Sequence, residues 1–298
     1  MAYEWFGIDF VPLAVTYGIS FIALLIGSIT DLKTREVPDW VNYGLVISGV
    51  CLNLLFSAIY SDLSFMMNSL VGLAIFFGIA YIMFYAGQWG GGDSKMIMGL
   101  GAMIGIDVGH LKSQFLSGFF VNALLVGAIY GLLWSILLVF KNREKFMKEF
   151  NKMLLGNGVV LWKKIILAAV ISLVALSFLS KLIYIKILVL SIAVLVLTTF
   201  YLWIFVKAIE KSCMHKLVEP SKLTEGDWIV KDVYVGKQYI CGPKDLGISK
   251  NQIRKLIQFH KRKKIKKILI KEGIPFVPSF LIAFVVTFVF GSPIIYLV

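Results

Sequence analysis

Residues 11–31 read VPLAVTYGISFIALLIGSITD, and this stretch decides the class of the fold. Residues 11–30 carry no charge, which is about the length that a helix needs to cross the hydrocarbon core of a membrane. The stretch ends at Asp31. A charged side chain at the centre of a membrane costs at least ~2.5–3.5 kcal/mol, so an acid at this position calls for a reason. We therefore predict a membrane-spanning helix that carries a functional carboxyl group at its end.

The rest of the chain repeats this apolar pattern. Of its 298 residues 59% are hydrophobic and 16% are charged, whereas soluble domains have about 25% charged residues. The composition predicts an all-α polytopic membrane protein of about eight membrane-spanning helices. The range is six to eight, because the fourth apolar segment is short and could be re-entrant. The expected spans are 10–30, 40–60, 67–86, 93–106, 114–140, 165–180, 184–206 and 276–297.

The basic residues predict the orientation of these spans. If all eight segments cross, 27 of the 30 Lys and Arg residues lie on one side, and Lys112, Lys181 and Lys186 lie on the other. Basic loops stay in the cytoplasm. We therefore expect both chain termini outside the cell, with Asp31 and Asp93 both at the cytoplasmic face. The loops on that face are 31–39, 87–95, 141–164 and 207–275.

The second acid follows three glycines, in the stretch GGGDSK at residues 90–95. Glycines permit unusual backbone conformations and allow a substrate backbone to approach closely. An acid at the start of a helix is also favoured by the helix dipole, so Asp93 alone could be an ordinary helix cap. Two aspartates at the same depth, however, form the kind of pair that shares one proton in aspartic proteases.

Both acids stand in longer motifs. Residues 90–105, GGGDSKMIMGLGAMIG, resemble the GxGDxK…GA..G signature of prepilin peptidases. Residues 31–40, DLKTREVPDW, resemble the first-aspartate motif of the same family. The stretches LTEGDW at 223–228 and KEGIPFVP at 271–278 resemble the archaeal branch, which processes prepilins and prearchaellins. The resemblance covers about residues 20–110 and 220–285.

The resemblance implies a membrane-embedded aspartic endopeptidase. Such enzymes remove short N-terminal signal peptides from type IV prepilin-like or prearchaellin precursors at the cytoplasmic face of the membrane. By motif position, Asp31 and Asp93 are the catalytic pair and Gly90 and Gly92 are the motif glycines. Asp39 matches a non-catalytic motif position, where it either anchors the loop or contacts the basic leader of the substrate.

Glu36 is assigned the same two alternatives, a leader contact or a plain loop role. The expected partners are precursor proteins and the lipid bilayer, with no nucleic acid, and the oligomeric state stays open. We expect no cofactor and no metal, since the histidines have no partners at metal-ligand spacing. The cysteines form no CxxC pair of the kind found in bacterial members that also methylate, so we expect no methyltransferase activity. They are Cys51, Cys213 and Cys241.

The change in sequence texture at residues 208–274 also suggests a division into three parts. We expect a transmembrane catalytic region at 1–207, a cytoplasmic α+β domain at 208–274 and a C-terminal transmembrane helix at 275–298. Within the α+β domain, alternation of β-branched and aromatic residues predicts strands, and Ser249 is a good helix N-cap. The expected elements are strands at 228–235, 237–241 and 265–270 and a helix at 250–260.

Two other functions remain as alternatives. A presenilin or signal-peptide-peptidase type of protease also uses GxGD, but its first aspartate follows a tyrosine, whereas Thr30 precedes Asp31 here. Such proteases also use a Pro-Ala-Leu element that this sequence lacks. A non-enzymatic transporter could carry protons on its aspartates, but transporters show repeats and helices broken in mid-span. The prepilin-type peptidase is favoured over both.

Overall fold

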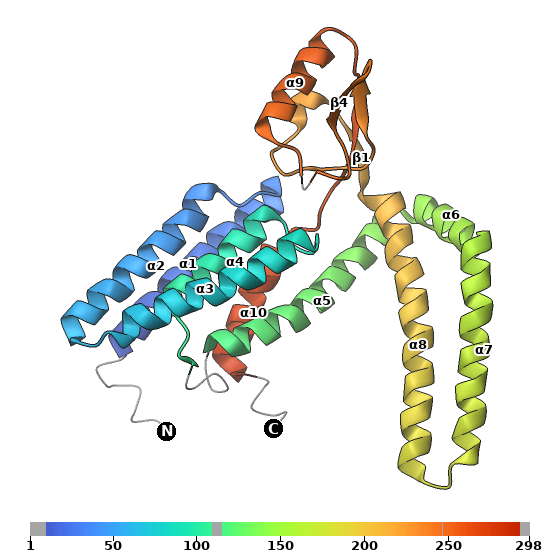
Figure 1. The fold of residues 1–298 in the computed structure, drawn as a ribbon, viewed down its shortest axis with the longest axis horizontal. Coiled ribbons are helices and arrows are strands. Elements are labelled where there is room, and N and C mark those ends of the chain that lie inside the picture. Colours follow the sequence, from blue (N-terminus) through green and yellow to red (C-terminus); the bar gives the residue numbers. More distant parts are fainter. Residues whose placement is uncertain (1–9, 109–114, 246, 293–298) are drawn as a thin grey trace. The chain divides into compact units, whose positions relative to one another are not determined.

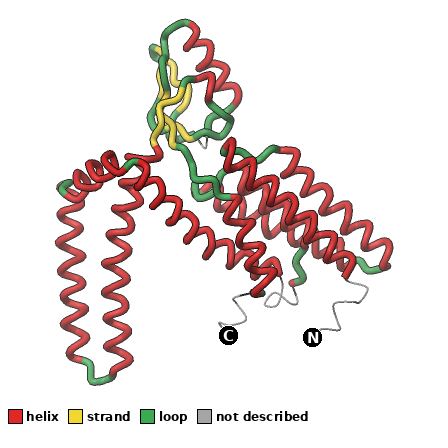
Figure 2. The backbone as a smooth tube through the Cα atoms, turned by 180° about the vertical axis from the view of Figure 1, so that it is seen from behind, coloured by secondary structure: helices red, strands yellow, loops and turns green. Residues whose placement is uncertain are grey.

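A computed structural model describes residues 10–108, 115–245 and 247–292. The described residues are mostly helical and form two compact units, coloured along the chain in Figure 1. The first unit consists of residues 1–133 and 273–298, and the second of residues 134–272. The predicted class, a helical membrane protein with a small sheet-containing domain, is confirmed, as the red helices and yellow strands of Figure 2 show.

The first unit is built from helices. In the part of the chain that the structure describes, α10 returns from the far end of the sequence to pack against α1. Helix α5 begins in this unit and continues past its boundary. The helices are α1 (Phe10–Thr34), α2 (Asp39–Tyr60), α3 (Ser64–Tyr85), α4 (Gly91–Ile104), α5 (Phe115–Lys141) and α10 (Val277–Phe290).

Six helices in the described residues are long and apolar enough to cross a membrane, so the chain is a multi-pass membrane protein. Two of the eight expected spans, α4 and α10, have 14 residues each, about 21 Å of helix, which is shorter than the hydrocarbon core of about 30 Å. The end of the last expected span, residues 293–297, lies outside the described residues. The six spans are Val11–Thr34, Asp39–Tyr60, Ser64–Tyr85, Phe115–Lys141, Asn157–Leu179 and Ile183–Met214.

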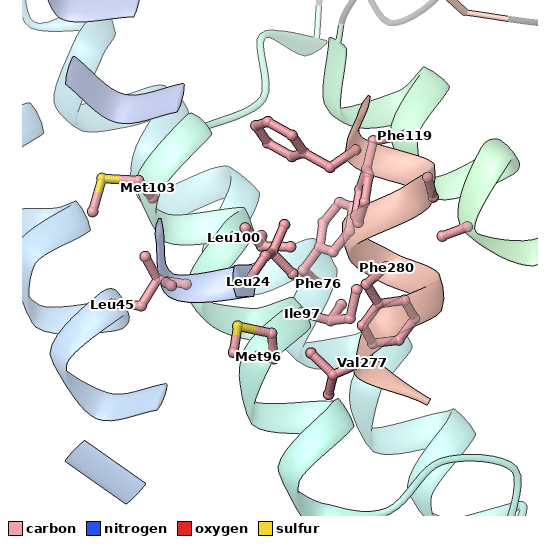
Figure 3. Packing of buried hydrophobic residues seen from close by; sticks show 14 of the residues in the cluster. Leu24, Leu45, Phe76, Met96, Ile97, Leu100, Met103, Phe119, Val277 and Phe280 are labelled. Atoms are coloured by element: carbon pink, nitrogen blue, oxygen red, sulfur yellow. The ribbon is translucent and has the colours of Figure 1, made fainter. Parts of the chain in front are cut away.

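The short helix α4 is the centre of the first unit. Small residues let its neighbours approach closely, as in other membrane helix pairs. A Cβ atom on Gly101 would lie 2.6 Å from the carbonyl oxygen of Gly72 on α3, and one on Gly99 would lie 2.8 Å from the Leu45 side chain on α2. Figure 3 shows the buried side chains of this core. Those drawn from α4 are Met96, Ile97, Leu100 and Met103, beside Leu24 of α1, Phe76 of α3 and Phe280 of α10.

The far end of α4 is closed by polar side chains from its neighbours. Its last carbonyl groups would otherwise lack partners in a region without water, which is costly. The Asn53 side-chain amide of α2 donates to the carbonyl oxygens of Ala102 and Met103 at 3.3 and 3.1 Å. The Ser69 hydroxyl of α3 donates to the Ala102 oxygen at 2.6 Å. These bonds allow a helix of 14 residues to end inside the protein.

The second unit combines a helical hairpin with a small α+β domain. Helix α6 lies inside the stretch 141–164 that the sequence predicted to be a loop. Of the residues of α7 only Ser177 is buried, as expected of a helix that faces lipid. The helices are α6 (Arg143–Leu154), α7 (Asn157–Leu179), α8 (Ile183–Ile209), followed by a π-helical turn (Glu210–Met214), and α9 (Lys250–Lys261).

The strands of this unit form two small antiparallel sheets, one with the order β1-β5-β2 and one made of β3 and β4. The single strand expected at 228–235 is in fact two, β2 and β3, which belong to different sheets. Strand β1 was not predicted. Ser249 caps α9 as predicted, since its hydroxyl oxygen accepts a hydrogen bond from the backbone N–H of Gln252. The strands are β1 (His215–Val218), β2 (Trp228–Ile229), β3 (Val233–Val235), β4 (Gln238–Cys241) and β5 (Ile268–Lys271).

Candidate active site

Asp31 lies in the last turn of α1 and is buried, with 6% of its surface exposed. Its Oδ2 atom accepts a hydrogen bond of 3.0 Å from the backbone N–H of Val277, the first residue of α10. The start of a helix carries partial positive charge, so it stabilises a nearby carboxylate. The structure thus places Asp31 where α10 begins, 246 residues further along the chain.

Asp93 lies in the first turn of α4, directly after the glycine triplet. Its Oδ2 atom accepts a hydrogen bond of 2.9 Å from the backbone N–H of Gly90, the N-cap residue of α4. The carboxyl group therefore folds back over the glycine turn. A Cβ atom on Gly90 would lie 3.2 Å from this same oxygen, so the turn leaves little room for a side chain. The first motif glycine thus shapes the position of the acid.

The two motif segments pack directly against each other. A Cβ atom on Gly92 would lie 3.3 Å from the Val37 side chain, in the loop that follows Asp31. One turn before Asp31, a Cβ atom on Gly27 would lie 2.7 Å from the end of the Met96 side chain, one turn after Asp93. This packing brings the two acids together, and the charge of Asp31 acts repulsively on Asp93. Glycine at 92 leaves room for Val37, whereas at 27 the close atom is the flexible end of the Met96 side chain.

The other two predicted site residues are Glu36, in the loop between α1 and α2, and Asp39, the first residue of α2. Glu36 is exposed. Asp39 opens α2, and its carboxylate forms an ion pair of 2.6 Å with the Lys95 ammonium group on α4. The same ammonium group lies 5.0 Å from the centre of the Tyr43 ring. Asp39 therefore joins the first motif to the lysine of the second, an anchoring contact that the sequence alternatives included.

Two further groups near Asp31 were not predicted from the sequence. Arg35, one turn after Asp31, donates from Nη1 to the Gly273 carbonyl oxygen at 2.6 Å, in the segment that leads into α10. Tyr130 of α5 interacts electrostatically with both Asp31 and Arg35. Arg35 lies within the first-aspartate motif, but the motif assigned it no role, and for Tyr130 the sequence offered no signal beyond its place in an apolar helix. Among the described residues, no cluster of His, Cys, Asp or Glu is arranged to hold a metal ion.

Comparison with known proteins places these motifs in a family. Residues 18–132 match the type IV leader peptidase family. Preflagellin peptidases of Methanococcus voltae and Methanococcus maripaludis are each 30% identical to the chain, over about half of its length and 67% of theirs. The chain belongs to the type IV leader peptidase family. The membership predicted from the residues around Asp31 and Asp93 is confirmed.

A third relative is more similar over a shorter stretch. The preflagellin peptidase of Methanocaldococcus jannaschii is 43% identical over 90 residues, which are 30% of this chain and 38% of that protein. The match to the leader peptidase family covers α1 from residue 18, α2 to α4, and α5 up to residue 132, and these helices carry both aspartates and Tyr130. The family match therefore lies within the first unit, where the candidate site is built.

Proposed function

We propose that this chain is an aspartic endopeptidase of the membrane that removes short N-terminal signal peptides from prearchaellin or type IV prepilin-like precursors. Its membership of the leader peptidase family and the names of its relatives support the reaction class. The observation that carries the assignment of residues is the packing of the Asp31 and Asp93 segments through Gly92 and Val37.

The mechanism follows from two carboxyl groups that share one proton. The ionised aspartate takes a proton from water, and the water oxygen attacks the carbonyl carbon of the scissile peptide bond. The protonated aspartate donates a hydrogen bond to the carbonyl oxygen as it gains negative charge. The proton taken from water then passes from the first aspartate to the nitrogen of the leaving amine as the C–N bond breaks. Because two adjacent carboxyls titrate as a pair, the rate should be bell-shaped in pH.

The position of the site suits a substrate that is itself partly in the membrane. Asp31 lies one turn from the end of a spanning helix, and Asp93 lies in the first turn of α4. In our proposal both face the cytoplasm, so water reaches them and the hydrophobic segment of the precursor lies in the bilayer beside the helices. The basic leader would stay in the cytoplasm near Glu36. Asp39, which is already paired with Lys95, would contribute less to that contact.

The test is a cleavage assay with two precursors. Detergent-solubilised protein is mixed with a prearchaellin and with a type IV prepilin, and the N-terminus of any product is sequenced. The proposal expects cleavage just before the hydrophobic segment of at least one precursor. No cleavage of either by folded protein would contradict it. A Glu36→Gln variant in the same assay should raise KM and leave kcat within twofold of wild type if Glu36 contacts the leader.

A further inference from the structure

Arg35 stands in an unusual backbone conformation at the end of α1. It is the first residue after the helix, and its φ angle is 62°, in the left-handed region. Glycine usually occupies such a position, and sometimes asparagine, because other side chains there crowd the backbone. An arginine at this turn is therefore unfavourable unless its side chain is needed for a contact.

The Arg35 side chain contacts a distant part of the chain, the segment 273–277 that leads into α10. Its Nη1 atom donates a hydrogen bond of 2.6 Å to the carbonyl oxygen of Gly273, 238 positions further on. Gly273 is exposed, and a Cβ atom on it would have no neighbour within 4 Å. Side-chain packing therefore does not hold this end of the segment. The hydrogen bond from Arg35 holds it, and the charge of the donor strengthens that bond.

The other end of this segment is fixed where α10 begins. A Cβ atom on Gly127 of α5 would lie 2.6 Å from the Phe276 ring, and one on Gly27 of α1 would lie 3.3 Å from Cγ1 of Val277. Phe276, the N-cap residue of α10, offers no side-chain hydrogen bond to the first amides of the helix. The Asp31 carboxylate takes that role, since it accepts a hydrogen bond of 3.0 Å from the Val277 N–H.

These contacts form a closed ring through Asp31. The Arg35 backbone N–H donates to the Asp31 carbonyl oxygen at 2.9 Å, which ties the two residues together within one helical turn. From Arg35 the ring passes through its side chain to Gly273 and along the backbone to Val277. The Val277 N–H then closes it at the Asp31 carboxylate. Loss of the Arg35 side chain would open the ring and release one end of the backbone that places the Val277 N–H.

Building on the proposed function, we propose that Arg35 is a positioning residue of the active site. Its hydrogen bond to Gly273 fixes the backbone that presents the Val277 N–H to Asp31. With Oδ2 held by that N–H, the Asp31 carboxyl group keeps one orientation, and Oδ1 faces the water and the shared proton. A small misplacement of a catalytic group can lower the rate by a factor of up to about 100. An exposed residue that touches neither substrate nor water therefore affects kcat.

The test compares two variants of the full-length protein that each lose one positive charge near the end of α1. Arg35→Asn removes the donor to Gly273 but keeps a residue that tolerates the left-handed turn. Lys33→Gln, the control, removes an exposed basic side chain in the last turn of α1. For Arg35→Asn we expect kcat to fall about tenfold, as for loss of one hydrogen bond from a charged donor, with KM within about threefold. Lys33→Gln should keep kcat within about twofold of wild type.

A second measurement follows the segment itself and does not need activity. Hydrogen–deuterium exchange of the peptide that contains residues 273–277 reports how often its backbone N–H groups open to water. Exchange in this peptide should be at least about fivefold faster in Arg35→Asn than in wild type, and unchanged in Lys33→Gln. Exchange in α2 serves as the reference, because general destabilisation would accelerate exchange in α2 as well.

The outcomes separate this inference from the proposed function. If wild type cleaves and Arg35→Asn keeps the kcat of wild type, or loses no more than Lys33→Gln, the inference is overturned and the peptidase assignment stands. If wild type cleaves neither precursor, hydrogen exchange decides the inference. Faster exchange confined to the segment 273–277 in Arg35→Asn supports it. Exchange equal to that of wild type, or acceleration that extends equally to α2, overturns it.

Discussion

At the scale of single residues, space rather than charge distinguishes the glycines before Asp93. A Cβ atom on Gly92 would press on Val37 at 3.3 Å, whereas one on Gly91 would meet its nearest neighbour, the Phe84 ring, at 3.9 Å. The first distance requires Val37 to move, and Val37 lies in the loop that follows Asp31. The second is an ordinary contact. The GxGD pattern thus has a physical basis, because the glycine next to the acid permits the two motifs to touch.

Gly92→Ala should therefore slow cleavage more than Gly91→Ala. We expect kcat/KM to fall about tenfold or more for Gly92→Ala, since a small misplacement of catalytic groups can cost a factor of up to about 100. Gly91→Ala should remain within about twofold of wild type. Initial rates on the cleaved precursor, measured for both variants side by side, check this. Equal effects of the two substitutions would contradict the account.

The ion pair of Asp39 with Lys95 should matter little for activity. Both side chains are substantially exposed, with 61% and 35% of their surfaces accessible, and exposed ion pairs contribute about 0–1 kcal/mol. Asp39→Asn should therefore lower kcat/KM by less than about fivefold. A loss comparable to that of Asp31→Asn would show that Asp39 takes part in the reaction. The sequence alone allowed Asp39 either to anchor the loop or to contact the substrate leader, because Lys95, with which it forms the ion pair, is 56 positions away.

At the scale of elements, α4 explains how a short helix supports the site. The apolar pattern predicted its position well, because helix and expected span differ by only two residues at each end. The shortness of α4 is compensated by close contacts with α2 and α3 and by the hydrogen bonds that Asn53 and Ser69 donate to its last carbonyl groups. Periodicity cannot predict these bonds, since each joins residues on different helices. Gly99 and Gly101 allow the close approach of α2 and α3 to this helix.

Gly101→Ala should destabilise the protein, whereas Gly78→Ala should not. The new methyl group at 101 would meet the backbone of Gly72, which cannot turn aside, and overpacking of this kind costs about 1–3 kcal/mol. At Gly78 on α3 a Cβ atom would have nothing within 4 Å. Thermal unfolding in detergent should show a lower midpoint for Gly101→Ala alone. Unchanged midpoints for both variants would contradict the packing described for α4.

Helix α6 shows why part of the second unit escaped prediction. The seven basic residues of the stretch 141–164 led it to be interpreted as a loop that marks the cytoplasmic side. Phe146 and Phe150 nevertheless lie one turn apart and stack at 5.4 Å, and Phe146 packs on Phe205 of α8. The pair of aromatics at helical spacing was the available signal. Charge density says which side of the membrane a segment occupies, but it does not exclude a helix.

At the scale of the whole molecule, the site depends on segments that are distant in sequence. Asp31 is held by an amide 246 positions further on, and Arg35 bonds to a carbonyl 238 positions further on. The motif resemblance included residues 271–278 but gave no reason for it. The structure supplies one, since this segment leads into the helix whose first amide holds Asp31. The predicted division at 207 and 274 stays a prediction about domains.

The orientation in the membrane yields a separate test. If the basic loops face the cytoplasm, Lys152→Cys and Lys231→Cys should react with a membrane-impermeant maleimide only in inside-out vesicles. Lys181→Cys, between α7 and α8, should react only in right-side-out vesicles. Each variant is made in a chain whose three native cysteines are replaced by serine. Labelling of Lys181→Cys from the same side as Lys152→Cys would overturn the predicted topology.

The most direct measurement of the central claim is the cleavage rate of the two aspartate variants. Asp31→Asn and Asp93→Asn are purified in detergent, shown to unfold at temperatures close to that of wild type, and incubated with the precursor that wild type cleaves. The account predicts that each loses cleavage by at least about 1000-fold, because neither carboxyl can do the work of both. Cleavage at a tenth of the wild-type rate or faster by either folded variant would remove that residue from the catalytic pair.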